Sequence, residues 1–147
     1  MNRIPAVLSV LLMFAILCNF ANAYSETITV QAGSSVARSV TLSAGDKISG
    51  RIVVAFKSIK VSITDPEDKV ILIYNITDPV DFQFTGEKTG TYDFHFENSF
   101  SETIFVTLNY NVQRYIFGFP QEYIILFVIV GLALVAVIIF VAMSPKQ

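Results

Sequence analysis

The sequence predicts an all-β protein: an antiparallel β-sandwich or jelly roll of about eight short strands, followed by one transmembrane helix. Two observations carry this prediction. Between residues 24 and 113, apolar and polar residues alternate with period two, turn signals recur about every 8–12 residues, and no helical period is present. Residues 123–143 then form an uncharged apolar run, about 31 Å long as a helix, which matches the hydrocarbon core of a bilayer.

The composition supports one small domain between two apolar ends. The chain has 147 residues, 53% of them hydrophobic, and a mean hydropathy of +0.59, whereas roughly 45–50% apolar residues is usual for a soluble domain. Between Glu26 and Glu122 there are twelve acidic and eight basic side chains, a net charge of −4. This acidic middle has no basic patch, which argues against nucleic-acid binding.

Residues 1–23 have the layout of a secretory signal peptide cleaved before Tyr24. One positive charge, Arg3, precedes an apolar core from Ala6 to Leu17, and small residues end the segment. The alternative is an uncleaved anchor, but this core spans only about 18 Å as a helix. Cys18 is the only cysteine, so cleavage would leave a chain without a disulfide, a cysteine metal site or a cysteine nucleophile.

The strands are predicted from apolar positions that repeat at every second residue. In chain order they lie near residues 27–31, 36–42, 48–56, 61–63, 70–74, 80–84, 92–96 and 104–112. Glycine, proline and acidic residues mark the turns between them. The fifth, from Val70 to Tyr74, is apolar on both faces, which predicts a central or doubly covered strand.

The most strongly patterned stretch runs from Thr89 to Val112. Two alternating segments flank a short polar break from Asn98 to Glu102, which predicts an antiparallel β-hairpin with one buried face. This hairpin would close the sandwich and lead, through an aromatic linker at residues 114–122, to the membrane span.

The C-terminal part predicts a type I topology. With an exported N-terminus, residues 144–147 are cytoplasmic, and Lys146 agrees with the positive-inside rule. Gly131 has no small residue four positions away, so a helix-dimerisation motif is not supported. The segment before the span is rich in the aromatic residues typical of membrane interfaces, namely Tyr115, Phe117, Phe119 and Tyr123.

Two polar clusters contain residue types that can bind a metal ion. Asp93, His95 and Glu97 share one side of a strand, but one histidine with two carboxylates is a weak metal signal, and a solvated strand face is favoured. The acidic turn at residues 65–68 lacks the spaced ligands of a calcium loop and fits ordinary turn chemistry. We therefore predict no catalytic, cofactor-binding or metal site, and no enzymatic activity.

Three other residues are candidates for contacts outside the fold. Asn75 begins an Asn-Ile-Thr sequence, a potential N-glycosylation site on the exported side. Phe100 and Phe105 fall in a loop and on a polar strand face, where exposed aromatic residues often contact a partner. The alternative is that the opposite sheet or a loop buries both.

A longer motif runs through the same patterned stretch: Gly90-x-Tyr92-x-Phe94-x-Phe96-x-Asn98-Ser99-Phe100-Ser101, then a strand ending Tyr110-x-Val112. This motif resembles the closing motif of the GOLD (Golgi dynamics) domain. Upstream, Ala44-Gly45-Asp46, Val61-x-Ile63-x-Asp65-Pro66 and Val70 resemble its central strands, so the likeness covers Ser34 to Val112. It implies a β-sandwich of the kind found in single-pass cargo receptors of the early secretory pathway.

The sequence also departs from those receptors. His95 stands where they carry one half of a disulfide, whose partner is missing as well. Only about ten residues separate Val112 from Tyr123, so there is no membrane-proximal coiled coil. The tail, residues 144–147, lacks aromatic and dibasic coat-binding signals. The resemblance therefore implies the domain and the membrane topology, not coat binding.

The leading hypothesis is a non-catalytic type I single-pass membrane protein whose sandwich, residues 24–113, binds membrane or exported proteins as a cargo receptor or adaptor. The bilayer would be its second partner, through residues 123–143. The alternatives are an accessory subunit of a larger membrane complex and a surface carbohydrate-binding module.

Overall fold

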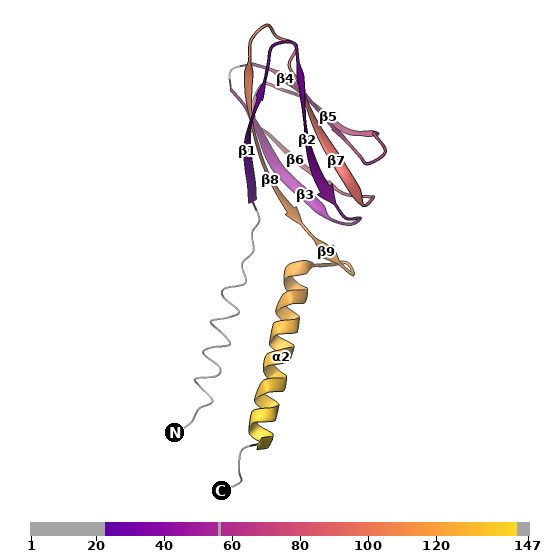
Figure 1. Ribbon diagram of the computed structural model, residues 1–147, viewed down its shortest axis with the longest axis vertical. Helices are drawn as coiled ribbons and strands as arrows, with labels where there is room; N and C mark the ends of the chain where they lie inside the picture. Colours follow the sequence, from indigo (N-terminus) through magenta and orange to yellow (C-terminus); the bar gives the residue numbers. More distant parts are fainter. Residues whose placement is uncertain (1–22, 56, 144–147) are drawn as a thin grey trace. The chain divides into compact units, whose positions relative to one another are not determined.

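The computed structural model describes residues 23–55 and 57–143 (Figure 1). The predicted signal peptide, except for Ala23, and the predicted tail at residues 144–147 lie outside the described residues, and both stay predictions. The chain forms two units, one ending at Tyr115 and the other beginning at Ile116.

The first unit is a sandwich of two four-stranded antiparallel sheets (Figure 1). The sheet that we name the β8 sheet has the order β1 (Ala23–Val30), β8 (Ile104–Gln113), β3 (Lys47–Val54), β6 (Val80–Thr85). The other, the β7 sheet, has the order β2 (Ser35–Leu42), β7 (Gly90–Glu97), β4 (Ile59–Thr64), β5 (Val70–Ile76). These interleaved orders are those of a jelly roll, so the predicted fold class is confirmed.

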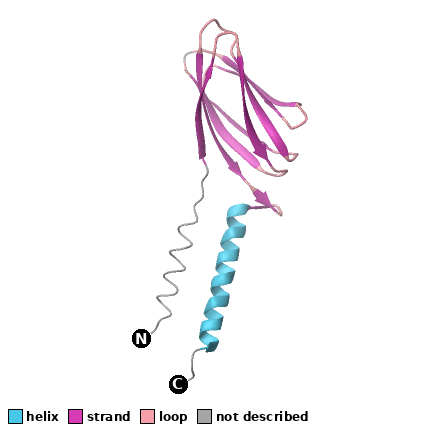
Figure 2. Ribbon diagram, viewed as in Figure 1, coloured by secondary structure: helices cyan, strands magenta, loops and turns pink. Residues whose placement is uncertain are grey.

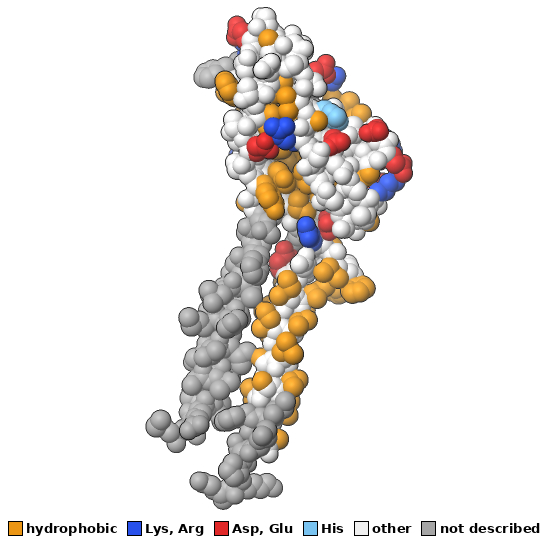
Figure 3. All heavy atoms as spheres, in the orientation of Figure 1, with side chains coloured by type: hydrophobic (Ala, Val, Ile, Leu, Met, Phe, Trp, Pro, Cys, Tyr) orange, Lys and Arg blue, Asp and Glu red, His pale blue; other side chains and the backbone are white. Residues whose placement is uncertain are grey.

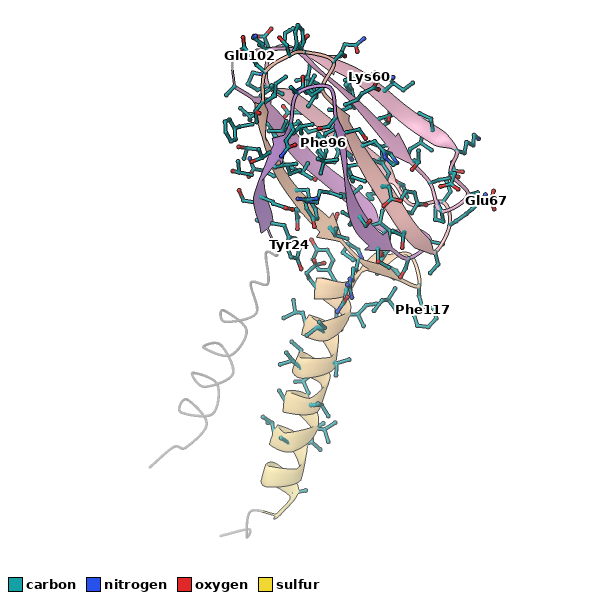
Figure 4. All side chains as sticks on the ribbon, turned by 45° about the horizontal axis from the view of Figure 1, so that its top comes forward. Tyr24, Lys60, Glu67, Phe96, Glu102 and Phe117 are labelled. Carbon is teal, nitrogen blue, oxygen red and sulfur yellow. The ribbon has the colours of Figure 1, made fainter. Side chains whose placement is uncertain are left out.

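Period-two alternation builds the core, because every second side chain of each strand points into the space between the sheets. Phe94 and Phe96 of β7 are fully buried, Phe96 lies between the sheets in Figure 4, and the Phe94 ring meets that of Phe82 edge-on at 5.3 Å. Burying a side chain of this kind contributes about 1.5–3 kcal/mol. The other buried apolar residues are Ile28, Val30, Val40, Leu42, Ile48, Ile52, Val54, Ile59, Val61, Ile63, Ile76, Tyr92, Ile104, Val106 and Leu108.

The predicted hairpin over Thr89–Val112 is wrong in its pairing. Both strands form where expected, but β7 pairs with β2 and β4, while β8 pairs with β1 and β3. The connection between them therefore crosses from one sheet to the other. Alternation determines which face of a strand is buried but not its neighbour, and an arch between two sheets buries the same residues as a hairpin would.

The prediction of a central or doubly covered fifth strand is also wrong. β5 is the edge of the β7 sheet and pairs only with β4. Ile76 is buried, but Ile73 points outward and is 59% exposed, and Val70 is 47% exposed. An apolar pattern on both faces does not separate a covered strand from an edge strand with an exposed apolar outer face.

One buried amide joins two connections at the same end of the sandwich. The Asn98 side chain is 1% exposed, and its Nδ2 donates to the carbonyls of Val30, Gln31 and Glu102 at 3.2, 3.1 and 2.7 Å. Its Oδ1 accepts from the Phe100 amide at 2.9 Å. The turn after β1 and the connection after β7 are thus tied through one side chain.

The second unit is a small hairpin and a helix (Figure 2). β9 (Tyr115–Ile116) pairs with β10 (Phe119–Pro120), so part of the expected linker is a β-hairpin. α2 (Gln121–Met143) follows directly and covers the predicted span. Its segment Gln121–Ile138 has a mean hydropathy of 2.4, and Figure 3 shows hydrophobic side chains along it. The helix is long and apolar enough to cross a membrane.

Asn98→Ala should lower the free energy of unfolding of the sandwich by roughly 2–4 kcal/mol, because it leaves several buried polar groups without partners. Urea unfolding of the full-length protein in detergent, followed by near-UV circular dichroism, measures this. Asn111→Ala, at an exposed outward position of β8, is the matched control. Equal stability of the two variants would contradict the assigned role of Asn98.

Candidate binding surface

A shallow groove of about 600 Å³ lies on the outer surface of the β8 sheet. The strand register places its outward residues in two rows across the four strands. Ser25, Asn109, Arg51 and Asp81 form one row, and Ala23, Asn111, Ser49 and Gln83 form the other. The groove therefore combines side chains that are far apart in the sequence.

A glycine allows the strands under the groove to approach closely. A Cβ at Gly50 would lie 2.1 Å from the carbonyl oxygen of Asn109 and 2.8 Å from ring carbons of Phe82. Phe82 is the register partner of Gly50 and covers the place of its missing side chain. Such cross-strand coverage of a strand glycine by an aromatic ring stabilises the sheet there.

The charges of the groove are paired with each other. Arg51 Nε donates to Asp81 Oδ1 at 2.6 Å, and a second guanidinium nitrogen donates to Oδ2 at 2.8 Å. This hydrogen-bonded pair raises the pKa of Arg51 and lowers the pKa of Asp81. The remaining polar lining consists of amides and hydroxyls, which both donate and accept hydrogen bonds. The groove therefore combines a neutralised charge pair and hydrogen-bonding groups with apolar surface, which is the larger share of its lining.

The strands under the groove also carry two stacked tyrosines. The rings of Tyr24 and Tyr110 stack with centroids 5.1 Å apart and an angle of 16° between their planes. Tyr24 is 53% exposed. Burial of the Tyr110 hydroxyl raises its pKa, and the nearby Tyr24 and Glu26 add to this effect. In β1 and β8 they alternate with the outward residues, and Tyr110 packs against the core, so the ring pair lies on the inner face of the β8 sheet and not in the groove.

The structure leaves both predicted contact residues exposed, against the alternative that they are buried. Phe105 is 54% exposed on the outer surface of the β8 sheet, the surface that carries the groove. Phe100 is 40% exposed in the connection after β7, where the Lys57 ammonium lies 5.6 Å from its ring centroid. Their contact with a partner stays a prediction.

The predicted cluster of Asp93, His95 and Glu97 lies on the outer surface of the β7 sheet. Each of its side chains contacts a different neighbouring side chain. Asp93 accepts from the Ser39 hydroxyl at 2.5 Å, Glu97 pairs with Lys60 at 2.8 Å, and His95 Nε2 lies 3.3 Å from Thr64 Oγ1. Within residues 23–55 and 57–143, no three histidine or acidic side chains are grouped to hold a metal ion.

The acidic turn at residues 65–68 uses its first carboxylate to hold the backbone. Asp65 accepts from the amides of Glu67 and Lys69, both at 2.9 Å, and the Lys69 amide is the main reason why the pKa of Asp65 is lowered. Lys88 pairs with Glu67. Asn75, the candidate glycosylation site, is exposed on the edge strand β5, and its modification stays a prediction.

In residues 23–55 and 57–143, these features define a class: a jelly-roll sandwich with an open groove on its outer surface, followed by one helix of membrane-spanning length. The family described as emp24/gp25L/p24 family/GOLD matches residues 27–118. The chain belongs to this family, which confirms the resemblance to the GOLD domain. The family is non-catalytic in general.

Two of the solved structures that resemble this chain have low identity to it, and the first of these two shows the same fold. The pre-peptidase C-terminal domain of a Bacillus anthracis collagenase has a TM-score of 0.51 and 9% identity, over 59% of this chain and 87% of that one. The periplasmic g-type lysozyme inhibitor PliG of Aeromonas hydrophila has a TM-score of 0.49 and 13% identity, over 64% and 89%. A comparison with curated proteins finds no match.

Sequence reasoning missed the groove. Alternation placed Arg51, Asp81 and Asn109 on polar faces, but only the pairing of β3 with β6 and β8 brings them together. Gly50, within an otherwise alternating strand, was the one local signal of a close backbone approach.

Gly50→Ala should destabilise the sandwich by roughly 1–3 kcal/mol, because the added methyl group overlaps the Asn109 carbonyl and neither strand can move without loss of pairing. Chemical unfolding of the full-length protein measures the change. The same substitution at Gly131 in α2, where a Cβ meets nothing within 4 Å, is the control and should leave sandwich stability unchanged.

Acid should weaken the Arg51–Asp81 pair. Because the folded-state pKa of Asp81 is depressed, its contribution is present above the unfolded pKa of about 3.9 and is lost as pH falls through the folded pKa. Midpoints of chemical unfolding are measured at about pH 6 and about pH 3, which lie on either side of this titration. The two midpoints should differ less for Asp81→Asn than for the unmodified protein. An identical acid dependence in both proteins would refute the linkage.

Proposed function

We propose that this protein is a non-catalytic type I single-pass membrane protein that presents its GOLD sandwich on the exocytoplasmic side to bind another protein, as a cargo receptor or adaptor does. Its membership of the emp24/gp25L/p24 family supports this role. The observation that carries the proposal is the arrangement of one polar-grooved sandwich followed, after a short hairpin, by one apolar helix.

The outer surface of the β8 sheet is the proposed binding surface. Asn109 and Asn111 offer donors and acceptors for polypeptide backbone, while Phe105, on the same face of the same strand, supplies an exposed aromatic ring. A protein-binding surface usually combines polar groups, which align the partner, with an aromatic residue that becomes buried when the partner binds. An extended polypeptide segment fits this combination.

The proposed topology follows from the two ends of the chain. Residues 1–23 are proposed to direct export, residues 123–143 to cross the bilayer, and residues 144–147 to remain in the cytoplasm. Its partners would be exported proteins or the exported domains of membrane proteins.

The carbohydrate-binding alternative would use the amides and hydroxyls of the groove, which can form hydrogen bonds with a sugar. A third alternative, an accessory subunit, would instead bind its complex through α2 and residues 115–119.

The proposal predicts that a photo-crosslinking amino acid at Asn111 or Phe105 of the full-length protein, in its own membrane, yields a covalent adduct with one defined polypeptide. The same amino acid at Ala37, exposed on the outer face of the β7 sheet, should not. Mass spectrometry of the adducts identifies the partner. Absence of a polypeptide adduct at both positions would refute a protein-binding role for this surface.

Two further measurements separate the alternatives. Replacement of α2 by an unrelated apolar helix should leave the adduct unchanged for a receptor and abolish association for an accessory subunit. Specific binding of the sandwich, residues 24–113, to a glycan array would favour the carbohydrate-binding role instead.

A further inference from the structure

We propose that Phe117, at the turn of the β9–β10 hairpin, inserts into the interfacial layer of the lipid bilayer and forms a second membrane contact beside α2. This inference rests on the proposed membrane span. It adds a lipid-binding element outside the helix.

The backbone of the turn does not favour phenylalanine at this position. Phe117 has a φ of 52° and Gly118 a φ of 80°, so two consecutive residues have the left-handed conformation of a two-residue type I′ turn. Asparagine or aspartate before glycine is preferred in such turns, because a bulky side chain is crowded by its own backbone in this region.

Packing within the protein does not favour a phenylalanine at position 117 either. Phe117 is 94% exposed, the highest value among the large exposed hydrophobic side chains of the described residues. In Figure 4 its side chain projects from the hairpin. Its neighbour Phe119 is 62% exposed and Ile116 is 39% exposed. An apolar cluster held on a tight turn gains stability only from an apolar environment outside the chain.

The short distance along the chain identifies that environment as lipid. Three residues separate Phe117 from Gln121, the first residue of α2, so Phe117 lies within about 14 Å of the start of the helix. The layer on each side of the hydrocarbon core that contains the headgroups is about 5–8 Å thick. Aromatic residues concentrate in this layer, and apolar side chains of peripheral segments insert there.

The sandwich holds Tyr115 and leaves the residues that follow it free to enter lipid. The Tyr115 amide donates to Asp46 Oδ1 at 3.0 Å, and the Lys47 ammonium lies 5.1 Å from the centroid of its ring. Of the aromatic residues predicted at the interface, Tyr115 is therefore bound to protein. Phe117, at 94%, is the most exposed of the other three.

The test uses the absence of tryptophan from the chain, since a single introduced tryptophan is then the only indole fluorophore. Full-length Phe117→Trp is reconstituted into phosphatidylcholine vesicles that carry bromine either near the headgroup or at mid-chain. We expect strong quenching by the headgroup-proximal bromine, weaker quenching by the mid-chain bromine, and protection from aqueous acrylamide. Leu132→Trp, within α2, should be quenched by mid-chain bromine, and Phe105→Trp, on the sandwich, by acrylamide alone.

The outcomes separate this inference from the proposed function. If Leu132→Trp is quenched by lipid and Phe117→Trp behaves like Phe105→Trp, the span stands and the lipid contact of Phe117 is refuted. If Leu132→Trp is not quenched by lipid, the span is refuted and the inference fails with it.

A second variant tests the side chain itself without damage to the turn. Phe117→Asn creates the preferred Asn-Gly sequence of a type I′ turn while removing the aromatic ring. With Phe119→Trp as reporter, lipid quenching should fall at least severalfold when Phe117→Asn is added, relative to Phe119→Trp alone. Unchanged quenching would show that Phe117 does not hold the hairpin in the bilayer.

Discussion

The sandwich depends on the non-covalent attraction between its two sheets, because Cys18, the only cysteine, has no second cysteine with which to form a disulfide. One apolar layer supplies most of this attraction. Buried polar side chains close the layer at both ends. At one end Asn98 joins the turn after β1 to the connection after β7. At the other, Asp46 is 2% exposed and accepts from the amides of Ser43 and Tyr115 at 2.9 and 3.0 Å.

The core is formed by inward side chains, which leaves the outer surface of the β8 sheet free for the proposed binding. The inward side chains of β3 and β8 hold the sandwich, so the outward ones, including Arg51, Asn109 and Phe105, carry little of its stability. Exposed ion pairs such as Arg51–Asp81 contribute little to folding, because water and salt screen their charges. A partner can therefore replace solvent on this surface without a rearrangement of the core.

The sequence predicted what depends on local periodicity and failed where the answer depends on pairing. Alternation located the strands and their buried faces, and the uncharged run located α2 within two residues. The arrangement of β7 and β8 in different sheets, and of β5 at an edge, is determined by which strands meet in three dimensions. The groove was missed for the same reason, since the Arg51–Asp81 contact joins residues 30 positions apart.

Strand pairing also shows why the sandwich can form with His95 at the position where the cargo receptors carry half of a disulfide. His95 points to the outer surface of the β7 sheet, where Ala37 and Ser62 are its register partners. A cross-link at this position would thus lie outside the apolar layer and would not join the two sheets through the core. Its absence leaves the inward residues Phe94 and Phe96, on either side of His95, fully buried. The GOLD sandwich can therefore form from its apolar layer and its buried polar side chains, without the disulfide that the cargo receptors carry.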